Sequence, residues 1–513
     1  MSLCNSLYRY SLFVIVSLLL DASGAEITNA RNLDANAFPP VNSTLSSILW
    51  TACDSELGFP SILECAKFSV PIDWDTPYGE HFDLGLVRLP AIPSNTSSKI
   101  GSLFINPGGP GSPASTMVSS MAQGAFQNQT LLLRAAFDII GLDPRGVGLS
   151  HQINCSKEIY AERVSWFPET EEEFDALVDK NKRLGESCRE LTGPLLEHVD
   201  TISAAKDHEA VRVALGNEPI NFLGLSYGSQ LGAQYIGLFP DNVRTFALDA
   251  IVQHSQSEAA NIHIDTSSYE LVLTHFFDWA ATDASSALHG QDVRALWLKL
   301  LGEAAETPIP ALSCDGTGCL PDVTAEEILF NAQGFLNFPG AGVGLGVSWQ
   351  LLASGLLDAS HGDASILSTS YSNPEVFSRL AIHCLDWNRS DSLSEIKAKL
   401  AMATAYTPLV RGAGHRWRAQ HACMGWPVAV KNPPRKLDIR SDTTVVMTSS
   451  TGDASTGLPW AVGMLEEIEN AVLVVRNGDG HGSLPLGGET SDIIGKYLIT
   501  GEAPAKKFLT TSS

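Results

Sequence analysis

The chain has 513 residues, of which 44% are hydrophobic and 18% are charged, with 43 Gly and 27 Pro. This composition excludes a disordered or low-complexity protein, because enough apolar residues are present to build a large core. The 33 Lys and Arg against 57 Asp and Glu give a formal net charge of −24, which argues against nucleic acid or an anionic membrane surface as a partner.

The amino terminus has the pattern of a secretory signal. Arg9 precedes the apolar run Ser11–Leu20, and the small residues Ser23–Ala25 follow it. Such a run is too short to span a bilayer, and small residues are typical of a cleavage site. We expect residues 1–25 to be a signal peptide, 26–48 to be an extended lead-in, and the protein to be secreted. No later segment has the length and hydrophobicity that predict an integral membrane helix.

Cysteines and glycosylation sequons agree with export. Outside the signal there are eight cysteines, and an even number in a secreted chain predicts four disulfides, although the sequence alone allows many pairings. Pairing neighbours along the chain is the simplest choice: Cys53–Cys65, Cys155–Cys188, Cys314–Cys319 and Cys384–Cys423. No Cys or His cluster has zinc spacing, so no metal is predicted. Sequons that predict a glycoprotein occur at Asn42, Asn95, Asn128, Asn154 and Asn388.

The first part of the chain, residues 49–255, alternates strand and helix patterns. Short alternating runs at 65–71 and 82–89 predict an opening pair of strands. Apolar runs then predict buried strands at 102–105, 137–142, 220–225 and 245–252, and helices are expected at 201–215 and 229–238. Continuous apolar strands separated by helices indicate a parallel sheet that is covered on both faces.

Residues 256–435 differ from this pattern. Aromatic-rich helical patterns such as 269–281 and 293–305 follow one another with little strand signal, which predicts a helical cap. The alternation returns in 436–513, with strands expected at 443–448 and 471–476 and helices at 459–468 and 491–498. The predicted fold class is α/β, with a mostly parallel central sheet interrupted by a large helical insertion.

Gly224-Leu-Ser-Tyr-Gly228 is the only G-x-S-x-G in the chain, and it lies between a buried strand and a helix. That setting is the one a nucleophile elbow requires, because a tight strand-to-helix turn exposes the serine hydroxyl at the carboxyl end of the sheet. We therefore expect Ser226 to be a catalytic nucleophile.

An elbow serine needs a base and an orienting acid, which follow it along the chain as Asp or Glu and then His. Asp453 and His481 lie in loops after two expected strands, so both emerge at the sheet edge that carries Ser226. Asp442 precedes its strand and would emerge at the opposite end, whereas Asp479 has no strand end of its own. The predicted triad is Ser226, Asp453 and His481.

The glycine-rich segment 106–112 directly follows the first buried strand. Glycines let backbone amides turn inward without a Cβ in the way, as an oxyanion hole requires. We expect Gly109 or its neighbour Gly108, together with the amide of Tyr227, to form this hole. The nearby Asp143-Pro-Arg145 segment is interpreted as scaffold, because charged pairs beside tight turns usually brace the backbone.

These motifs resemble the proline iminopeptidase and tripeptidyl aminopeptidase group of α/β-hydrolases. The resemblance is carried by 106–112, by 143–150 and by the segment from Thr201 to Pro240, which contains the elbow. It continues in Ala381–Asp386, Cys423–Pro427 and Gly478–Ser483, which are similar to the carboxyl-terminal domain of that group. It implies that Ser226, Asp453 and His481 match the nucleophile, acid and base of the family, and that the insertion matches its cap.

The resemblance favours an aminopeptidase that releases N-terminal residues or short peptides and needs no cofactor. Such an enzyme needs an anion for the substrate ammonium, and Asp386 is the candidate, although a solvated carboxylate at a helix end is an equal interpretation. The alternative is a carboxylesterase or another hydrolase of small esters or amides, because the same triad cleaves esters. A non-catalytic binding protein is the third alternative, but it would be expected to have a broken triad.

Overall fold

The computed structural model describes residues 48–92, 99–314, 318–340 and 347–512. The predicted signal peptide, all but the last residue of the predicted lead-in, and the sequons at Asn42 and Asn95 lie outside these ranges. In the described part of the chain, no helix combines the length and the hydrophobicity needed to cross a membrane.

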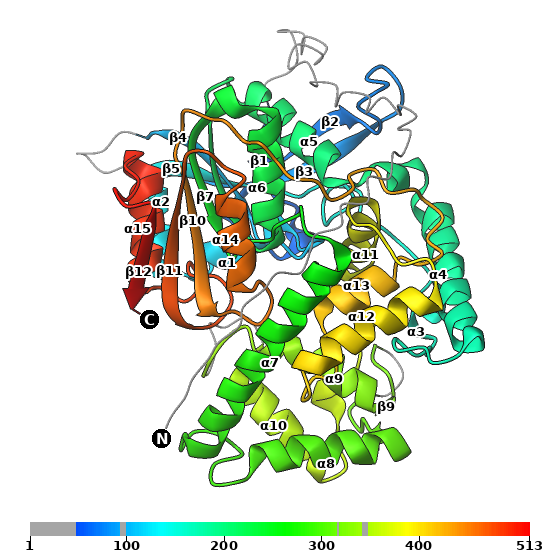
Figure 1. Cartoon of the computed structure of the whole chain (residues 1–513). Helices are drawn as coiled ribbons and strands as arrows, with labels where there is room; N and C mark the ends of the chain where they lie inside the picture. Colours follow the sequence, from blue (N-terminus) through cyan, green and yellow to red (C-terminus); the bar gives the residue numbers. More distant parts are fainter. Residues whose placement is uncertain (1–47, 93–98, 315–317, 341–346, 513) are drawn as a thin grey trace, which may run out of the picture. The chain divides into compact units, whose positions relative to one another are not determined.

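Strands of the described residues form one large sheet in the order β1-β2-β3-β5-β4-β6-β7-β10-β11-β12 (Figure 1). They are β1 Thr51–Ala52, β2 Glu64–Pro71, β3 His81–Leu89, β4 Gly101–Asn106, β5 Phe137–Leu142, β6 Ile220–Leu225, β7 Val243–Asp249, β10 Val445–Gly452, β11 Ala471–Asp479 and β12 Phe508–Ser512. Neighbours from β5 to β12 are parallel, whereas β1, β2, β3 and β5 pair antiparallel. The predicted mostly parallel sheet is confirmed, and its opening strands pair antiparallel.

The central strands are buried because helices cover both faces of the sheet. Every residue of β5 and β6 is buried. The covering helices are α1 Ala114–Ala122, α2 Gln127–Arg134, α5 Thr201–Ala214, α6 Tyr227–Leu238, α14 Leu458–Leu465 and α15 Gly488–Thr500. Four of them correspond to predicted helices, but α1, α2 and the edge strand β12 had not been predicted.

The strand expected at 245–252 ends earlier than its apolar pattern implied. β7 stops at Asp249, and Ala250 has a φ of 61°, in the left-handed region that breaks a strand. The Ala250 amide donates instead to the carbonyl of Thr448 on the neighbouring strand at 2.9 Å. Ile251 and Val252 are buried in the turn that follows. Their hydrophobicity reflects burial rather than extended structure.

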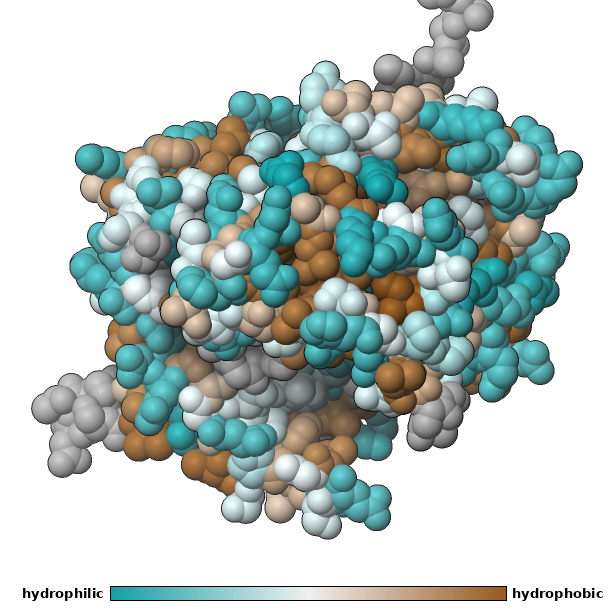
Figure 2. Space-filling model, turned by 90° about the horizontal axis from the view of Figure 1, so that it is seen from below, coloured by the Kyte–Doolittle hydropathy of each residue, from teal (hydrophilic) through white to brown (hydrophobic). Residues whose placement is uncertain are grey.

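A second group of helices packs together between β7 and β10. It comprises α7 Glu258–Thr282, α8 Val293–Glu306, α9 Ala325–Phe335, α10 Trp349–Ser360, α11 Glu375–Asp386, α12 Leu393–Tyr406 and α13 His415–His421, with the short strands β8 Ile309–Pro310 and β9 Asp322–Val323. The group has its own core, in which Tyr269, Trp297 and Trp417 are fully buried. Figure 1 shows these helices gathered beyond one edge of the sheet. Seen from that side, Figure 2 shows hydrophilic and hydrophobic residues interspersed.

Helices from an earlier segment join this group, which the sequence did not reveal. They are α3 Lys157–Ala161 and α4 Glu171–Thr192. Leu177 of α4 lies in the same core cluster as α7 and α8, and Asn181 donates from its side-chain amide to the His421 carbonyl at 2.8 Å. Charged residues make up half of α4, which hides its narrow apolar face from a pattern search.

The four predicted disulfides are confirmed among the described residues: Cys53–Cys65, Cys155–Cys188, Cys314–Cys319 and Cys384–Cys423. Each joins cysteines that are neighbours along the chain. Cys155–Cys188 ties the loop before α3 to α4, and Cys384–Cys423 ties α11 to the end of α13. Two of the bridges therefore fix helices of the second group.

Candidate active site

Ser226 lies in the turn between β6 and α6 and has a φ of 56° and a ψ of −123°. This backbone conformation costs a non-glycine residue about 1–3 kcal/mol, and such strain gathers at functional sites. The turn is also tightly packed, because a Cβ on Gly224 would lie 2.2 Å from the Gly228 carbonyl oxygen. The Ser226 amide donates to the Asp249 carbonyl at 2.8 Å. The serine is thus held at the carboxyl edge of the sheet with the amino terminus of α6 directly behind it.

Asp453 and His481 meet at the same edge. Asp453 directly follows β10, and His481 lies in the loop after β11. His481 Nδ1 is 2.9 Å from Asp453 Oδ2 and 3.0 Å from Oδ1. The His481 side chain is 15% exposed, and it lines the same cavity as Ser226, whereas Asp453 is fully buried. The other two carboxylates considered do not compete: Asp442 is exposed before β10, and Asp479 binds His275 at 2.7 Å.

The electrostatics of this pair favour a charged imidazolium beside a carboxylate. Burial alone would raise the pKa of Asp453, but the charge and hydrogen bond of His481 and the amides of Thr456 and Ser455 hold it below its ordinary value. Burial would likewise lower the pKa of His481, but the Asp453 carboxylate outweighs that effect and raises it. The arrangement therefore stabilises positive charge on the imidazole.

Three residues that sequence reasoning missed hold the two loops in place. Asp249 accepts hydrogen bonds from the amides of Ser483 and Leu484 just after the histidine, at 2.7 and 2.8 Å. Asn337 accepts from the His481 amide at 2.8 Å through its backbone carbonyl. Thr456 donates from its hydroxyl to Asp453 at 2.8 Å. Of these three residues, only Asp249 has a recognisable sequence pattern, because it is a carboxylate at the carboxyl end of a predicted buried strand.

The glycine-rich turn after β4 packs against the elbow. The Gly108 amide donates to the Asn106 side chain at 3.0 Å, so it is not free to bind a substrate oxygen. Gly109 lines the cavity together with Ser226 and His481. Of the two glycines predicted for an oxyanion hole, Gly109 is therefore the better placed, with the Tyr227 amide at the first position of α6 as its partner.

Substituting Gly108 by alanine is expected to distort the site. Gly108 has a φ of 98°, and a Cβ there would lie 2.5 Å from the Leu225 carbonyl oxygen and 2.9 Å from the Tyr227 amide nitrogen. The turn must move away from the elbow, which displaces the amide of Gly109. We expect kcat to fall ~100-fold or more, comparable to the loss of one oxyanion donor. Steady-state kinetics with a thermal unfolding control would measure it, and unchanged kcat in a folded variant would contradict the role of this turn.

The structure does not bring Asp386 into the cavity. This residue is the last of α11, is 1% exposed and accepts hydrogen bonds from Thr201, Gln230 and Asn432. The Thr201 hydroxyl also contacts the Tyr227 hydroxyl at 2.6 Å. Burial raises the pKa of Asp386 to about 7, although the hydrogen bonds from Thr201 oppose this. The geometry thus gives no support to an amine-binding role, and Asp386 instead links α11 to α5 through Thr201 and to α6 through Gln230.

Asp143 and Arg145 occupy structural positions, as interpreted from the sequence. The Asp143 carboxylate accepts from the amide and hydroxyl of Ser115 and from the Leu149 amide, each at 2.8 Å. Arg145 forms a fully buried bidentate pair with Asp207 at 2.6 and 2.7 Å. The polar groups of both side chains are thus engaged in contacts that hold loops of the protein together.

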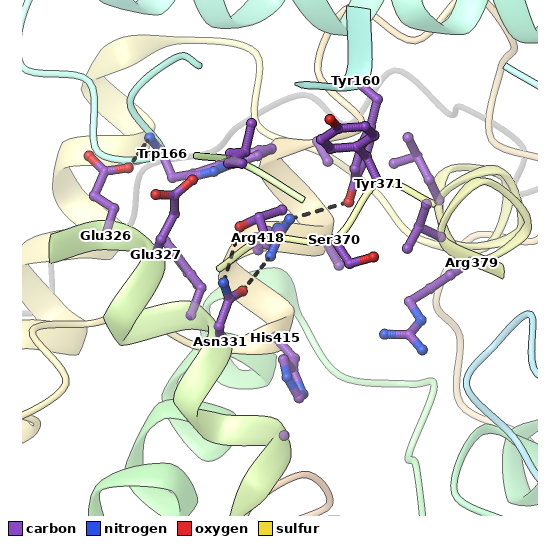
Figure 3. Close-up of a pocket in the computed structure, with 18 of the residues that line it drawn as sticks. Tyr160, Trp166, Glu326, Glu327, Asn331, Ser370, Tyr371, Arg379, His415 and Arg418 are labelled. Atoms are coloured by element: carbon purple, nitrogen blue, oxygen red, sulfur yellow. Dashed lines mark hydrogen bonds between the residues drawn. The ribbon is translucent and has the colours of Figure 1, made fainter. Parts of the chain in front are cut away.

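A cavity of about 940 Å³ opens over Ser226 and His481. Its floor is formed by the elbow and by the glycine-rich turn 106–112, the candidate oxyanion turn. Its walls come from α4, α9, α11, α13 and the loop 368–371. Figure 3 shows Glu326 and Glu327 on one side of this pocket and Arg379 on the other. The volume is that of a small-molecule or short-peptide site. In the described parts of the chain, no group of three or more His, Cys, Asp or Glu side chains is placed to hold a metal ion.

Comparisons with known proteins agree with the fold. A family model of the α/β hydrolase fold matches residues 101–276, and a model of TAP-like proteins matches residues 407–509. A tripeptidyl aminopeptidase of Streptomyces lividans is 28% identical, with 95% of this chain and 88% of that protein aligned. A Mycobacterium tuberculosis serine protease, Hip1, is 27% identical over 89% of each chain. Carboxylesterase B of the same organism is 27% identical over 89% of this chain and 88% of its own.

Proposed function

We propose that the chain is a serine aminopeptidase. It is an α/β hydrolase with a TAP-like carboxyl-terminal segment, and its relatives are named as peptidases or as a carboxylesterase. It would release single N-terminal residues or short peptides, of the prolyl or tripeptidyl type. The observation that carries this proposal is the convergence of Ser226 and the hydrogen-bonded pair His481–Asp453 on one cavity. The names of two relatives, tripeptidyl aminopeptidase and serine protease, support a peptide substrate.

The proposed mechanism is acyl transfer in two steps. His481 accepts the proton of the Ser226 hydroxyl as the oxygen attacks the substrate carbonyl, and Asp453 holds the imidazole and stabilises its charged form. The amides of Gly109 and Tyr227 bind the oxyanion. His481 then protonates the leaving amine, and water, activated by the same imidazole, releases the acyl group from Ser226. This sequence of steps uses side chains and amides alone and requires no cofactor.

The walls of the cavity support action at a free amino terminus. They enclose the serine from several sides, which favours chain ends and short peptides over the middle of a folded protein. Glu326 at the start of α9 lines this cavity, and the hydrogen bonds that it accepts come from neutral groups, the Ser165 hydroxyl and the Trp166 amide. Its carboxylate therefore supplies the negative charge that a substrate ammonium needs, and it replaces Asp386 in the proposal.

The second candidate function is a carboxylesterase, which the name of one relative favours. Three substrates separate the two: a tripeptide p-nitroanilide with a free amine, the same anilide with an acetylated amine, and a p-nitrophenyl ester. An aminopeptidase is expected to cleave the free amine at least ~100-fold faster than the acetylated form, because acetylation removes the charge that the Glu326 carboxylate binds. If the protein cleaves the ester but neither of the two anilides, the result would contradict the aminopeptidase and favour the esterase.

Secretion is part of the proposal. Four disulfides form among the described residues, and such bridges persist in oxidising compartments. The amino-terminal sequence pattern and the sequons at Asn128, Asn154 and Asn388 point in the same direction. A secreted peptidase would act on peptides outside the cell.

A further inference from the structure

One wall of the cavity carries a cation that the protein itself leaves unpaired. Arg379 on α11 is exposed to the cavity, and its one recorded hydrogen bond is a long one, from Nε to the Pro110 carbonyl at 3.4 Å. Among the described residues it forms no ion pair. Glu375, one turn earlier, accepts a hydrogen bond from Ser112 at 3.2 Å instead.

Three further cations, Arg416, Arg418 and Lys180, line the cavity and form no close ion pair in the described part of the chain. The Arg416 guanidinium lies 5.2 Å from the centre of the Trp460 ring, and Arg418 donates to Asn331 at 3.4 Å. Lys180 is 6% exposed, and burial, followed by the charge of Arg418, lowers its pKa to about 8. A protein with a formal net charge of −24 thus gathers four cations, including Arg379, around one cavity.

The carboxylates of the same cavity are, in contrast, bound by groups of the protein. Their partners are Arg183 at 2.6 Å from Glu162, Arg163 at 3.0 Å from Glu327, and the Ser165 hydroxyl at 2.7 Å from Glu326. Arginines thus compensate Glu162 and Glu327, Glu326 is held by neutral donors, and the side of the cavity that carries Arg379 is positive. A hydrogen bond from an arginine to a carboxylate is stronger than one between neutral groups, so an anionic ligand that pairs with this side gains affinity.

Arg379 is the cation best placed to act near the reacting bond. A Cβ on Gly111, in the oxyanion turn, would lie 2.7 Å from the Arg379 amide, so α11 packs directly on that turn. The two terminal nitrogens of its guanidinium form a planar fork that matches a carboxylate with two parallel hydrogen bonds. A lysine at this position would offer a point charge without the fork.

We infer that the substrate carries a carboxylate near the scissile bond and that Arg379 is the specificity-determining residue that binds it. This inference rests on the proposed hydrolase function, because it assigns the substrate of that same site. An acidic side chain of the substrate or the free carboxyl terminus of a short peptide would supply the group. In the second case the ammonium lies toward Glu326 and the carboxylate lies at Arg379, as a short zwitterionic peptide requires.

Two matched substrate pairs test the inference on the full-length protein. The first pair is Ala-Ala-Glu and Ala-Ala-Gln p-nitroanilide, which differ in one side-chain charge. The second is tetra-alanine with a free or an amidated carboxyl terminus. We expect the wild type to prefer the acid of at least one pair by ~10–100-fold in kcat/KM, the range of a charge-assisted hydrogen-bonded pair. The pair that responds identifies which carboxylate binds.

The variants Arg379→Met, Arg379→Lys and Arg163→Met complete the experiment. In Arg379→Met the ratio of kcat/KM for the acidic substrate to kcat/KM for its amide should fall to ~1. Arg379→Lys should retain an intermediate ratio, because it keeps the charge but loses the planar fork. Arg163 is the control, since it lines the same cavity but is paired with Asp322 and Glu327, and its loss should leave the ratio unchanged. Thermal unfolding of each variant confirms that it is folded.

The outcomes separate the inference from the proposed function. Equal rates for acid and amide in both pairs would overturn the inference while leaving a working hydrolase. A preference for the acid that persists in Arg379→Met would overturn the assignment to Arg379. Loss of all hydrolysis on replacing Arg379, for neutral and acidic substrates alike, would also overturn it. Failure of the proposed function itself would appear as wild-type protein that cleaves none of these peptides.

Discussion

Replacing Ser226 by alanine is expected to abolish hydrolysis of every substrate that the wild type cleaves. In the proposed mechanism the side-chain oxygen of Ser226 forms the covalent intermediate, and the proposal includes no second nucleophile. In enzymes that use this chemistry, removal of the serine lowers kcat by ~10⁶. The change should be measured under single-turnover conditions with the tripeptide p-nitroanilide, and covalent labelling by a fluorophosphonate should disappear with the same substitution.

The matched control is Ser229, a buried serine in the first turn of α6. Ser229 Oγ donates to the Ser226 carbonyl at 2.6 Å and accepts from the Val252 amide at 2.9 Å. Ser229→Ala should therefore lower the free energy of unfolding by about 1–3 kcal/mol, because it leaves buried groups unsatisfied, yet keep most of the activity. Ser226→Ala should show the reverse pattern, with unfolding changed by less than about 0.5 kcal/mol. Activity of Ser226→Ala above ~1% of wild type would remove Ser226 from the role of nucleophile.

The elbow was predictable because its determinants are local. A buried strand, a glycine-flanked serine and a helix follow one another within a single stretch of chain, and β6 has the bounds expected from its apolar pattern. α6 begins at Tyr227 rather than at Ser229, because the helix starts immediately after the strained serine. The positions of Asp453 and His481 followed from one rule of topology, namely that parallel strands end at a common edge.

The walls of the cavity were not predictable, because they depend on contacts between distant segments. α4 packs on α13 through residues far apart in sequence, and its apolar stripe is narrow. The position of Asp386 was missed for the same reason: its partners Thr201 and Asn432 come from two other segments, so a carboxylate at a helix end became a buried link. Nor could the sequence separate Gly108 from Gly109, because the distinction depends on one hydrogen bond to Asn106.

Asp453→Asn is expected to lower kcat/KM by ~10⁴, because an amide neither stabilises the imidazolium nor holds the productive tautomer of His481. The substitution should also shift the pH profile. In the wild type the carboxylate raises the pKa of His481, and only the neutral imidazole accepts a proton, so activity should fall as the pH drops through a value above about 6.5. Without the carboxylate, the acid limb of the residual activity should move to lower pH.

Stability should respond to pH in the opposite sense to activity. A raised pKa means that the charged imidazole is stabilised by folding, so its contribution is complete below about pH 6.5 and is lost as the pH rises through the folded pKa. The wild type should therefore lose unfolding free energy relative to Asp453→Asn as the pH rises above about 6.5, the direction in which activity rises. Denaturant unfolding at several pH values would measure this difference.

Asp479→Asn is the matched control for this prediction. Asp479 is the last residue of β11, two residues before His481, but its carboxylate binds His275 at 2.7 Å and not the His481 imidazole. Its replacement should leave the acid limb in place and change kcat/KM by less than ~10-fold, because it removes a neighbouring charge without breaking the pair at 2.9 Å between His481 and Asp453. If Asp479→Asn instead shifted the profile and Asp453→Asn did not, the orienting acid would be Asp479.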